Sequence, residues 1–202
     1  MTESRPGFVV VLCSFLALTG CATAEVLLPH SSVAPPGVDF SGTWQINERE
    51  SADQQSINRA VTQTDGVKNS STGGQSRQSN ARQARSSRNR GALVDVFLRT
   101  GRTLQITQTP YGFFVSVDRS VVEEFRFGES RMISVGEIEV QRASGWDGAS
   151  YVVETLDKNG NKMIQRFWLS EDENVLHREI TFRGRGDESA TVVQFFGRET
   201  KP

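Results

Sequence analysis

Apolar and polar residues alternate along most of the chain from residue 103 onward. A period of two is typical of β-strands, because successive side chains of a strand point to opposite faces. The pattern predicts a strand at residues 42–47 and nine more in the second half of the chain. These nine are expected at residues 103–108, 113–118, 121–127, 131–135, 138–143, 150–156, 162–169, 175–182 and 191–196.

Short turns separate these predicted strands. Asn159-Gly160 is a hairpin signal, because this pair accepts a positive φ. No long helical pattern follows residue 100, so consecutive strands are expected to be antiparallel neighbours. An open sheet of this size would expose its edges, and closure removes them. We therefore predict an all-β, up-and-down barrel of about ten antiparallel strands, with a two-sheet sandwich as the alternative.

A different pattern begins the chain. The apolar run at residues 8–18 has the length of a signal-peptide core and is too short to span a bilayer. It ends in Leu-Thr-Gly-Cys at residues 18–21, which resembles the bacterial lipobox. The resemblance implies that residues 1–20 are a lipoprotein signal peptide, cleaved between Gly20 and Cys21. Cys21 would then carry the lipid anchor, a diacylglycerol with acyl chains such as palmitate.

The residues after the cysteine bear on location. Ala22 stands where an aspartate would suggest retention in the inner membrane, so we expect a periplasm-facing lipoprotein of the outer membrane. An ordinary secretory cleavage after Ala24 and a simple anchor are the alternatives. Residues 21–37 are rich in Ser, Pro and Gly and predict a flexible tether. The barrel domain is expected to span residues 38–198.

A low-complexity insertion occupies residues 49–91. It has almost no core-forming side chains, so burial could not offset the entropy of ordering it. We predict disorder over residues 49–79, a frayed helix over 80–90, and a helix or a strand at 92–99. The insertion is basic, and it would contact anionic envelope partners through Arg77, Arg82, Arg85, Arg88 and Arg90. A solvated segment without a partner is the alternative.

Composition and motifs mainly exclude functions. The 23 Lys and Arg nearly balance 24 Asp and Glu, and the basic segment lacks aromatic residues, so we expect no nucleic-acid binding. Two cysteines cannot build a disulfide framework, and two histidines argue against a histidine-rich metal site. No nucleophile elbow, P-loop, zinc-protease or dinucleotide motif occurs. We therefore predict no enzyme activity, no cofactor and no metal.

Two parts of the sequence resemble bacterial lipocalin-like (calycin-type) lipoproteins. The first is Gly-Thr-Trp at residues 42–44. The second is an ordered set: Trp-Asp-Gly at 146–148, Val-Val-Glu-Thr at 152–155 and Arg-Phe-Trp-Leu-Ser at 166–170. The resemblance implies that Gly42 lets the chain enter a barrel tightly. It also implies that Trp44 plugs the closed end under a cation from a late strand, and that the barrel binds a small hydrophobic ligand.

Aromatic and polar residues on the later strands are the candidates for ligand contact: Tyr151, Glu154, Arg166, Trp168 and His177. Arg166 and Trp168 share one face of their strand, but alternation does not tell whether that face points inward. A lone histidine such as His177 is more typical of a pocket wall or a surface than of catalysis. The acidic residues 171–173 and the Arg-Gly-Asp at 185–187 are interpreted as turns.

The leading hypothesis is an envelope lipoprotein whose barrel binds or carries a small hydrophobic or amphipathic ligand. The alternative is a structural or interaction lipoprotein whose barrel is filled with side chains. An enzyme on this barrel is the third and weakest hypothesis. A cavity of about 300 Å³ or more favours the first hypothesis, and a packed interior favours the second.

Overall fold

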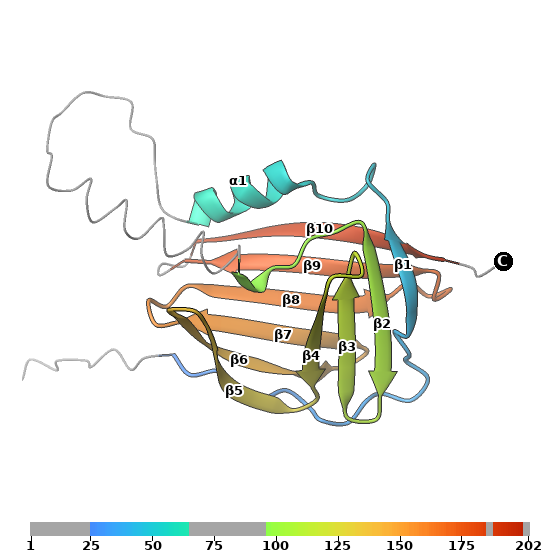
Figure 1. Cartoon of the computed structure of the whole chain (residues 1–202), viewed down its shortest axis with the longest axis horizontal. Coiled ribbons are helices and arrows are strands. Elements are labelled where there is room, and N and C mark those ends of the chain that lie inside the picture. Colours follow the sequence, from blue (N-terminus) through green and yellow to red (C-terminus); the bar gives the residue numbers. More distant parts are fainter. Residues whose placement is uncertain (1–24, 65–95, 185–187, 200–202) are drawn as a thin grey trace, which may run out of the picture.

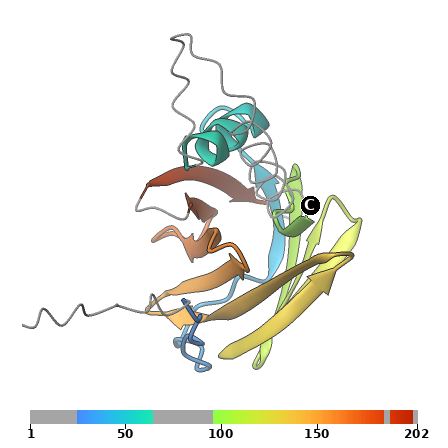
Figure 2. The same ribbon diagram turned by 90° about the vertical axis from the view of Figure 1, so that its left-hand side faces the viewer.

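The computed structural model describes residues 25–64, 96–184 and 188–199. Ten strands form one antiparallel sheet that curls around a common core, and a helix lies over it (Figure 1, Figure 2). The helix is α1 (Gln54–Thr64). The strands are β1 (Gly42–Ile46), β2 (Thr103–Thr109), β3 (Gly112–Val117), β4 (Val121–Arg126), β5 (Glu129–Val135), β6 (Ile138–Asp147), β7 (Ser150–Asp157), β8 (Lys162–Leu169), β9 (Val175–Arg183) and β10 (Ser189–Arg198).

The strand order makes this sheet a nearly closed barrel. In space the order is β4-β3-β2-β1-β10-β9-β8-β7-β6-β5, so β1 joins the last strand to β2. β4 and β5 are the two edges and do not pair with each other. Beside this gap, Ser144 Oγ donates a hydrogen bond to the carbonyl of Arg126, at 2.8 Å. The predicted up-and-down barrel of ten antiparallel strands is confirmed, and the sandwich is rejected.

Strand β9 illustrates how alternation places side chains. Leu176, Ile180 and Phe182 are buried, whereas the residues between them are half-buried. Arg178 belongs to the same alternating set and is also buried, at 4% exposure. The interior face of the barrel is therefore apolar with a few polar side chains among the apolar ones.

The turn between β7 and β8 forms at the predicted hairpin signal. Gly160 has φ +81°, a conformation that favours glycine. Asp157 Oδ1 accepts hydrogen bonds from the amides of Asn159 and Asn161, both at 2.8 Å. The aspartate side chain thus accepts hydrogen bonds from two backbone amides of the turn.

An aromatic cluster packs part of the barrel interior: Phe40, Phe113, Phe127, Trp146 and Tyr151. Ring centroids of contacting pairs in this cluster lie 4.1 to 6.1 Å apart. Edge-to-face and offset arrangements at this spacing are favourable beyond the area that they bury. This region is filled with side chains from β3, β6, β7 and the segments before β1 and β5.

Trp44 is fully buried in the same core. Its Nε1 donates to the carbonyl of Phe40 at 2.9 Å, so its polar atom is satisfied. The guanidinium of Arg198, on β10, lies 4.1 Å from the Trp44 ring centroid, and Nη1 donates to the carbonyl of Ser41 at 2.8 Å. At Gly42 φ is +146°, and a Cβ would lie 3.0 Å from Arg198 Nη1. A glycine is therefore favoured at position 42, because a side chain there would crowd Arg198. Trp44 offers the Arg198 guanidinium an aromatic face.

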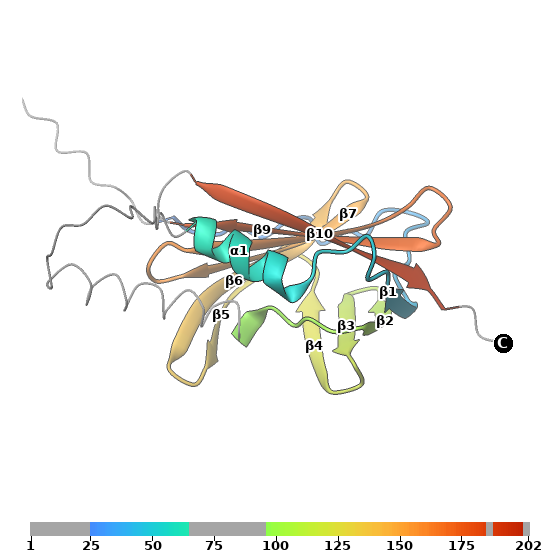
Figure 3. The ribbon, with the colours of Figure 1, turned by 90° about the horizontal axis from the view of Figure 1, so that it is seen from above.

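Helix α1 covers β9 and β10, as the view from above shows (Figure 3). Ile57, Ala60 and Thr64 are its buried residues, spaced so that they fall on one face. Asp53 caps the helix, since its Oδ1 accepts from the Ser56 amide at 2.8 Å. The prediction of disorder over residues 49–79 is therefore wrong for the part that includes α1, because a few well-spaced side chains suffice to dock it.

The remainder of the insertion lies outside the described residues. This applies to residues 65–95, and so to the predicted frayed helix and to Arg77, Arg82, Arg85, Arg88 and Arg90. Where the chain returns, Phe97 and Leu98 are buried beside α1, together with Met163 and Ile180.

Residues 25–34 form a strap along the outside of the sheet. Leu27 is 3% exposed and packs against Ala143 and Leu156. Ser31 pairs with Trp146, whose amide donates to the Ser31 carbonyl at 2.8 Å. The strap passes so close to β6 that a Cβ on Gly145 would lie 2.6 Å from the Ser31 carbonyl oxygen.

Ion pairs fix the beginning of the strap. Glu25 pairs with Arg183 and with Lys162, the latter at 3.2 Å, and His30 Nε2 lies 3.3 Å from Glu154 Oε2. The predicted flexible tether at residues 21–37 is therefore wrong for the strap, because one apolar side chain and several polar contacts hold it on the barrel. The predicted signal peptide and Cys21 lie outside the described residues.

We predict that Trp44→Ala destabilises the fold by about 3–5 kcal/mol, because it leaves a large cavity under Arg198. Urea unfolding followed by circular dichroism measures this change. Tyr111→Ala is the matched control, since Tyr111 is 81% exposed and its loss should change stability by no more than about 0.5 kcal/mol. Equal effects of the two substitutions would contradict a structural role of Trp44.

We also predict that the strap loosens in acid. Partial burial raises the pKa of Glu25, but Lys162 and Arg183 outweigh it, and the net pKa is below its ordinary value of 4.5. Because the folded pKa is depressed, this stabilisation is complete above pH 4.5 and is lost as pH falls through the folded pKa. Hydrogen-exchange protection of the Leu27 amide should fall in that window. Glu25→Gln should remove most of the pH dependence, and an unchanged profile in that variant would refute the assignment.

Candidate functional site

The candidate residues from the sequence do not share one site. Tyr151 points into the barrel, where its ring centroid lies 4.1 Å from that of Phe113. Its hydroxyl donates a long hydrogen bond, 3.4 Å, to the carbonyl of Arg126 beside the gap between β4 and β5. Burial raises the pKa of Tyr151 well above its usual range, so the hydroxyl stays protonated. Tyr151 is part of the packed core.

The other four candidates lie on the outer face of the barrel. Tyr151 is the register partner of Phe167, so Arg166 and Trp168, on either side of Phe167, must face outward. Glu154 lies beneath the strap and pairs with Lys162 at 2.5 Å. The prediction that they contact a ligand inside the barrel is therefore wrong for four residues: Glu154, Arg166, Trp168 and His177.

On that outer face the four residues have local partners. Arg166 pairs with Asp147 at 2.7 Å. Trp168 stacks on His177, with ring centroids 4.9 Å apart, and the edge of Phe195 meets His177 at 5.1 Å. Partial burial in this stack lowers the pKa of His177 and favours its neutral form.

Apart from Tyr151, the charged and polar side chains inside the barrel are not among the candidates that the sequence suggested. Arg178 on β9 is the central one. Its Nη2 donates to Gln165 Oε1 at 2.6 Å, and its Nη1 donates to the carbonyl of Arg99 at 2.8 Å and to Gln194 Oε1 at 3.4 Å. No carboxylate of the described residues forms an ion pair with Arg178. Its acceptors are therefore neutral dipoles.

The charge state of Arg178 follows from this environment. Burial lowers its pKa to about 10, against a smaller opposing effect of the Glu123 charge. The guanidinium thus remains protonated at neutral pH. A buried cation without a paired anion is unfavourable unless something else in the protein or a ligand compensates it.

Arg142 on β6 is a second buried cation. Its Nη2 lies 3.9 Å from Glu123 Oε1, and its guanidinium lies over the rings of Phe97 and Phe125, at 5.5 and 5.2 Å. Burial lowers its pKa, and Glu123 acts in the opposite direction. Its Nε, and Oγ1 of its register partner Thr155, are both buried and form no hydrogen bond with the described residues.

These two orphaned atoms lie on adjacent inward-facing positions. Leaving a buried donor or acceptor unpaired costs about 1–3 kcal/mol each, so such groups are uncommon unless they have a use. The alternation of β6 and β9 could have indicated both arginines.

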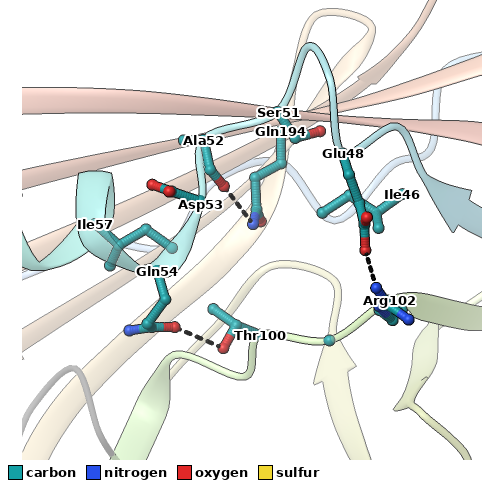
Figure 4. A pocket seen from close by; sticks show the side chains of 11 residues that line it. Ile46, Glu48, Ser51, Ala52, Asp53, Gln54, Ile57, Thr100, Arg102 and Gln194 are labelled. Atoms are coloured by element: carbon teal, nitrogen blue, oxygen red, sulfur yellow. Dashed lines mark hydrogen bonds and ion pairs between the residues drawn. The ribbon is translucent and has the colours of Figure 1, made fainter.

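A pocket of about 440 Å³ lies between the beginning of α1 and the segment before β2, and we call it the α1 pocket. Ile46, Ala52 and Ile57 supply its apolar wall. Gln194 reaches into it from β10, and Gln194 Nε2 donates to the carbonyl of Ala52 at 3.4 Å (Figure 4). Because Gln194 Oε1 accepts from Arg178, this glutamine connects the α1 pocket with the buried cation.

Two side-chain bridges cross the α1 pocket. Thr100 Oγ1 donates to Gln54 Oε1 at 3.2 Å, and Arg102 pairs with Glu48 at 2.5 Å (Figure 4). All four side chains are at the surface, where such pairs contribute about 1 kcal/mol or less. A ligand could open these bridges at little cost.

The described residues offer no other obvious chemistry. They contain no group of three or more His, Cys, Asp or Glu side chains that could hold a metal ion. In this part of the chain, no helix combines the length and the apolarity needed to cross a membrane.

Likenesses to known proteins are distant. No family model matches the sequence, and no curated protein matches it. The REP1-NXSQ fatty acid transporter aligns at 13% identity with a TM-score of 0.47, over 81% of this chain and 98% of that one. Fatty-acid-binding protein 1 of Echinococcus granulosus aligns at 13% and 0.46, over 80% and 98%. Zebrafish ileal bile acid-binding protein, solved with cholic acid, aligns at 14% and 0.43, over 79% and 98%.

We predict strong energetic coupling between Arg178 and Gln165. Gln165→Leu alone should cost about 1.5–3 kcal/mol, because it removes hydrogen bonds to a buried charge. The double variant with Arg178→Met should lose less than the sum of the two single variants, with a coupling free energy of about 1–3 kcal/mol. Urea unfolding of all four proteins measures the cycle. Gln105→Leu, at an exposed position of β2, is the control, and additive losses would contradict the coupling.

Proposed function

We propose that this chain is a non-enzymatic envelope lipoprotein whose barrel binds a small amphipathic ligand with an anionic head group. The observation that carries the proposal is Arg178, a protonated and buried guanidinium without an ion-paired carboxylate among the described residues. A carboxylate or a similar anion would supply the missing charge. Charge-assisted hydrogen bonds of this kind are about twice as strong as neutral ones.

The α1 pocket supplies the apolar part of such a site. Its volume of about 440 Å³ exceeds the roughly 300 Å³ at which ligand sites begin. The hydrocarbon of the ligand would contact Ile46, Ala52 and Ile57. Rotation of the Gln194 side chain, which lies between the α1 pocket and Arg178, would let the head group reach the guanidinium. The barrel interior also holds two buried polar atoms without a partner among the described residues, Arg142 Nε and Thr155 Oγ1, which are a donor and a hydroxyl oxygen.

The lipobox at residues 18–21 supports the location. Lipidation at Cys21 would anchor the chain, and Ala22 favours the outer membrane, facing the periplasm. Carriage of a poorly soluble acid between membranes or proteins is a role that such an anchored barrel could serve.

A second function is favoured by the aromatic cluster. It fills one part of the barrel, which suits a structural or interaction lipoprotein with a side-chain-filled interior. In that case the five arginines of the insertion would contact anionic envelope partners. Deletion of residues 65–95 would then abolish pull-down of the anionic partner, whereas the ligand-binding function predicts unchanged binding of the ligand; the lipid on Cys21 keeps the chain in the envelope in both cases.

The ligand proposal predicts a preference for acids. Calorimetric titration of the mature chain with dodecanoate and with dodecanol should show at least about tenfold tighter binding of the acid, a difference of roughly 1.4 kcal/mol. Arg178→Met should remove this preference. Arg166→Met is the matched control, because Arg166 faces outward beside Asp147 and should leave binding unchanged.

Two results would contradict the proposal. Equal affinities for the acid and the alcohol would show that Arg178 does not bind the head group. Binding of neither compound, together with a bare mass for protein purified from its own envelope, would favour the structural alternative.

A further inference from the structure

The strap runs from one end of the barrel to the other. Glu25 contacts Lys162 at the beginning of β8 and Arg183 at the end of β9. Ser31 pairs with Trp146, next to the turn between β6 and β7 at the opposite end. Figure 1 shows this segment in blue, entering at the end of the barrel where β7 turns into β8 and continuing beneath the sheet toward β1. We call the end that carries Lys162, Arg183 and the β7–β8 turn the anchor end.

Three independent contacts hold the strap in place. They are the ion pairs of Glu25, the burial of Leu27 against Ala143 and Leu156, and the backbone pairing of Ser31 with Trp146. Gly145 makes room for the last of these, since any larger residue would collide with the Ser31 carbonyl. The position at which the strap begins is therefore a fixed point on the barrel.

The distance from that point to the proposed lipid is short. Cys21 precedes Glu25 by four residues, which span at most about 14 Å when fully extended. Strand β8 has eight residues, so the turn between β8 and β9 lies roughly 26 Å farther along the barrel. A lipid on Cys21 can enter a bilayer only if the anchor end is near the membrane surface.

We propose that the strap holds the barrel against the membrane in one orientation, with the anchor end facing the lipid headgroups. This inference rests on lipidation of Cys21, which is part of the proposed function. The strap then determines which turns of the barrel lie at the membrane. A flexible linker would not fix this orientation. The turn that carries Lys158 lies at the surface of the bilayer, and the turn that carries Glu171 points away from it.

Site-directed labels test the orientation on the full lipidated chain. Cys13 would be removed with the signal peptide and Cys21 acylated, so Lys158→Cys or Glu171→Cys introduces one reactive thiol, at an exposed turn position in either case. The fluorophore-labelled protein is bound to phosphatidylcholine–phosphatidylglycerol vesicles that contain a headgroup nitroxide lipid. We expect at least about threefold stronger quenching at position 158 than at position 171, since nitroxide quenching falls off over a distance shorter than one strand.

A variant of the strap tests whether its contacts cause the quenching difference between positions 158 and 171. Glu25→Lys with Leu27→Asp breaks two of the three contacts and should bring the two labels to similar quenching. Glu124→Lys with Val122→Asp makes the same changes of charge on β4, at a half-buried and an exposed position that do not contact the strap, and should preserve the difference.

The failures are distinguishable. Equal quenching at positions 158 and 171 in an acylated chain overturns the orientation but leaves the anchor and the ligand site standing. An intact mass without an acyl group on Cys21 overturns the anchor and the orientation together. A difference that persists in the strap variant shows that the strap does not set the orientation, and it also overturns the proposal.

Discussion

The pairing of β1 with both β2 and β10 is the constraint on which the rest of the structure depends. β4 and β5 do not pair, so β1 is the bridge that joins the strands β2–β4 to the strands β5–β10. Its register sets Trp44 opposite Leu104 on one side and Arg198 on the other. This register places the indole under the guanidinium. It also directs the chain after Ile46 across β10, where Asp53 begins the helix that covers the barrel.

The same arrangement divides the interior into two regions with different chemistry. Around Trp146 and Tyr151 the space is filled by contacting rings, which stabilise the fold through dispersion and apolar burial. Elsewhere in the interior, the guanidinium of Arg178 is hydrogen-bonded to two glutamines, and Arg142 and Thr155, level with Met163 in the strand register, each have a buried polar atom without a partner among the described residues. Such groups lower stability compared with an apolar core. They are the usual signature of a site that a ligand completes.

Most of the fold could be predicted from the sequence, because alternation and turn chemistry are local properties. The hairpin at Gly160, the side of its strand that Arg178 shares with Leu176 and Ile180, and the strand that contains Trp44 all follow from a few neighbouring residues. Alternation is symmetrical between the two faces of a strand, however, so it could not decide that Phe167 faces inward and Arg166 outward. Only the register with Tyr151 on the neighbouring strand decides it.

The strap and α1 escaped prediction for a related reason. Each docks through very few apolar side chains, Leu27 in one case and Ile57 with Ala60 in the other, and their burial depends on surfaces that distant strands build. Low hydrophobic content correctly indicates that these segments cannot fold alone. It does not show that they lack a partner surface in the same chain, and here the barrel provides one.

The proposed ligand site depends on binding of an anionic head group by Arg178 inside the barrel. Nitrogen NMR of the arginine side chains tests it most directly, because buried guanidinium groups exchange slowly and give separate signals. On saturation with dodecanoate, we expect the Arg178 signals to shift together with those of the Gln194 side-chain amide, while the Arg166 signals stay unchanged. Bound acid that leaves the Arg178 signals in place, or that shifts only residues of the outer face, would contradict head-group binding by Arg178.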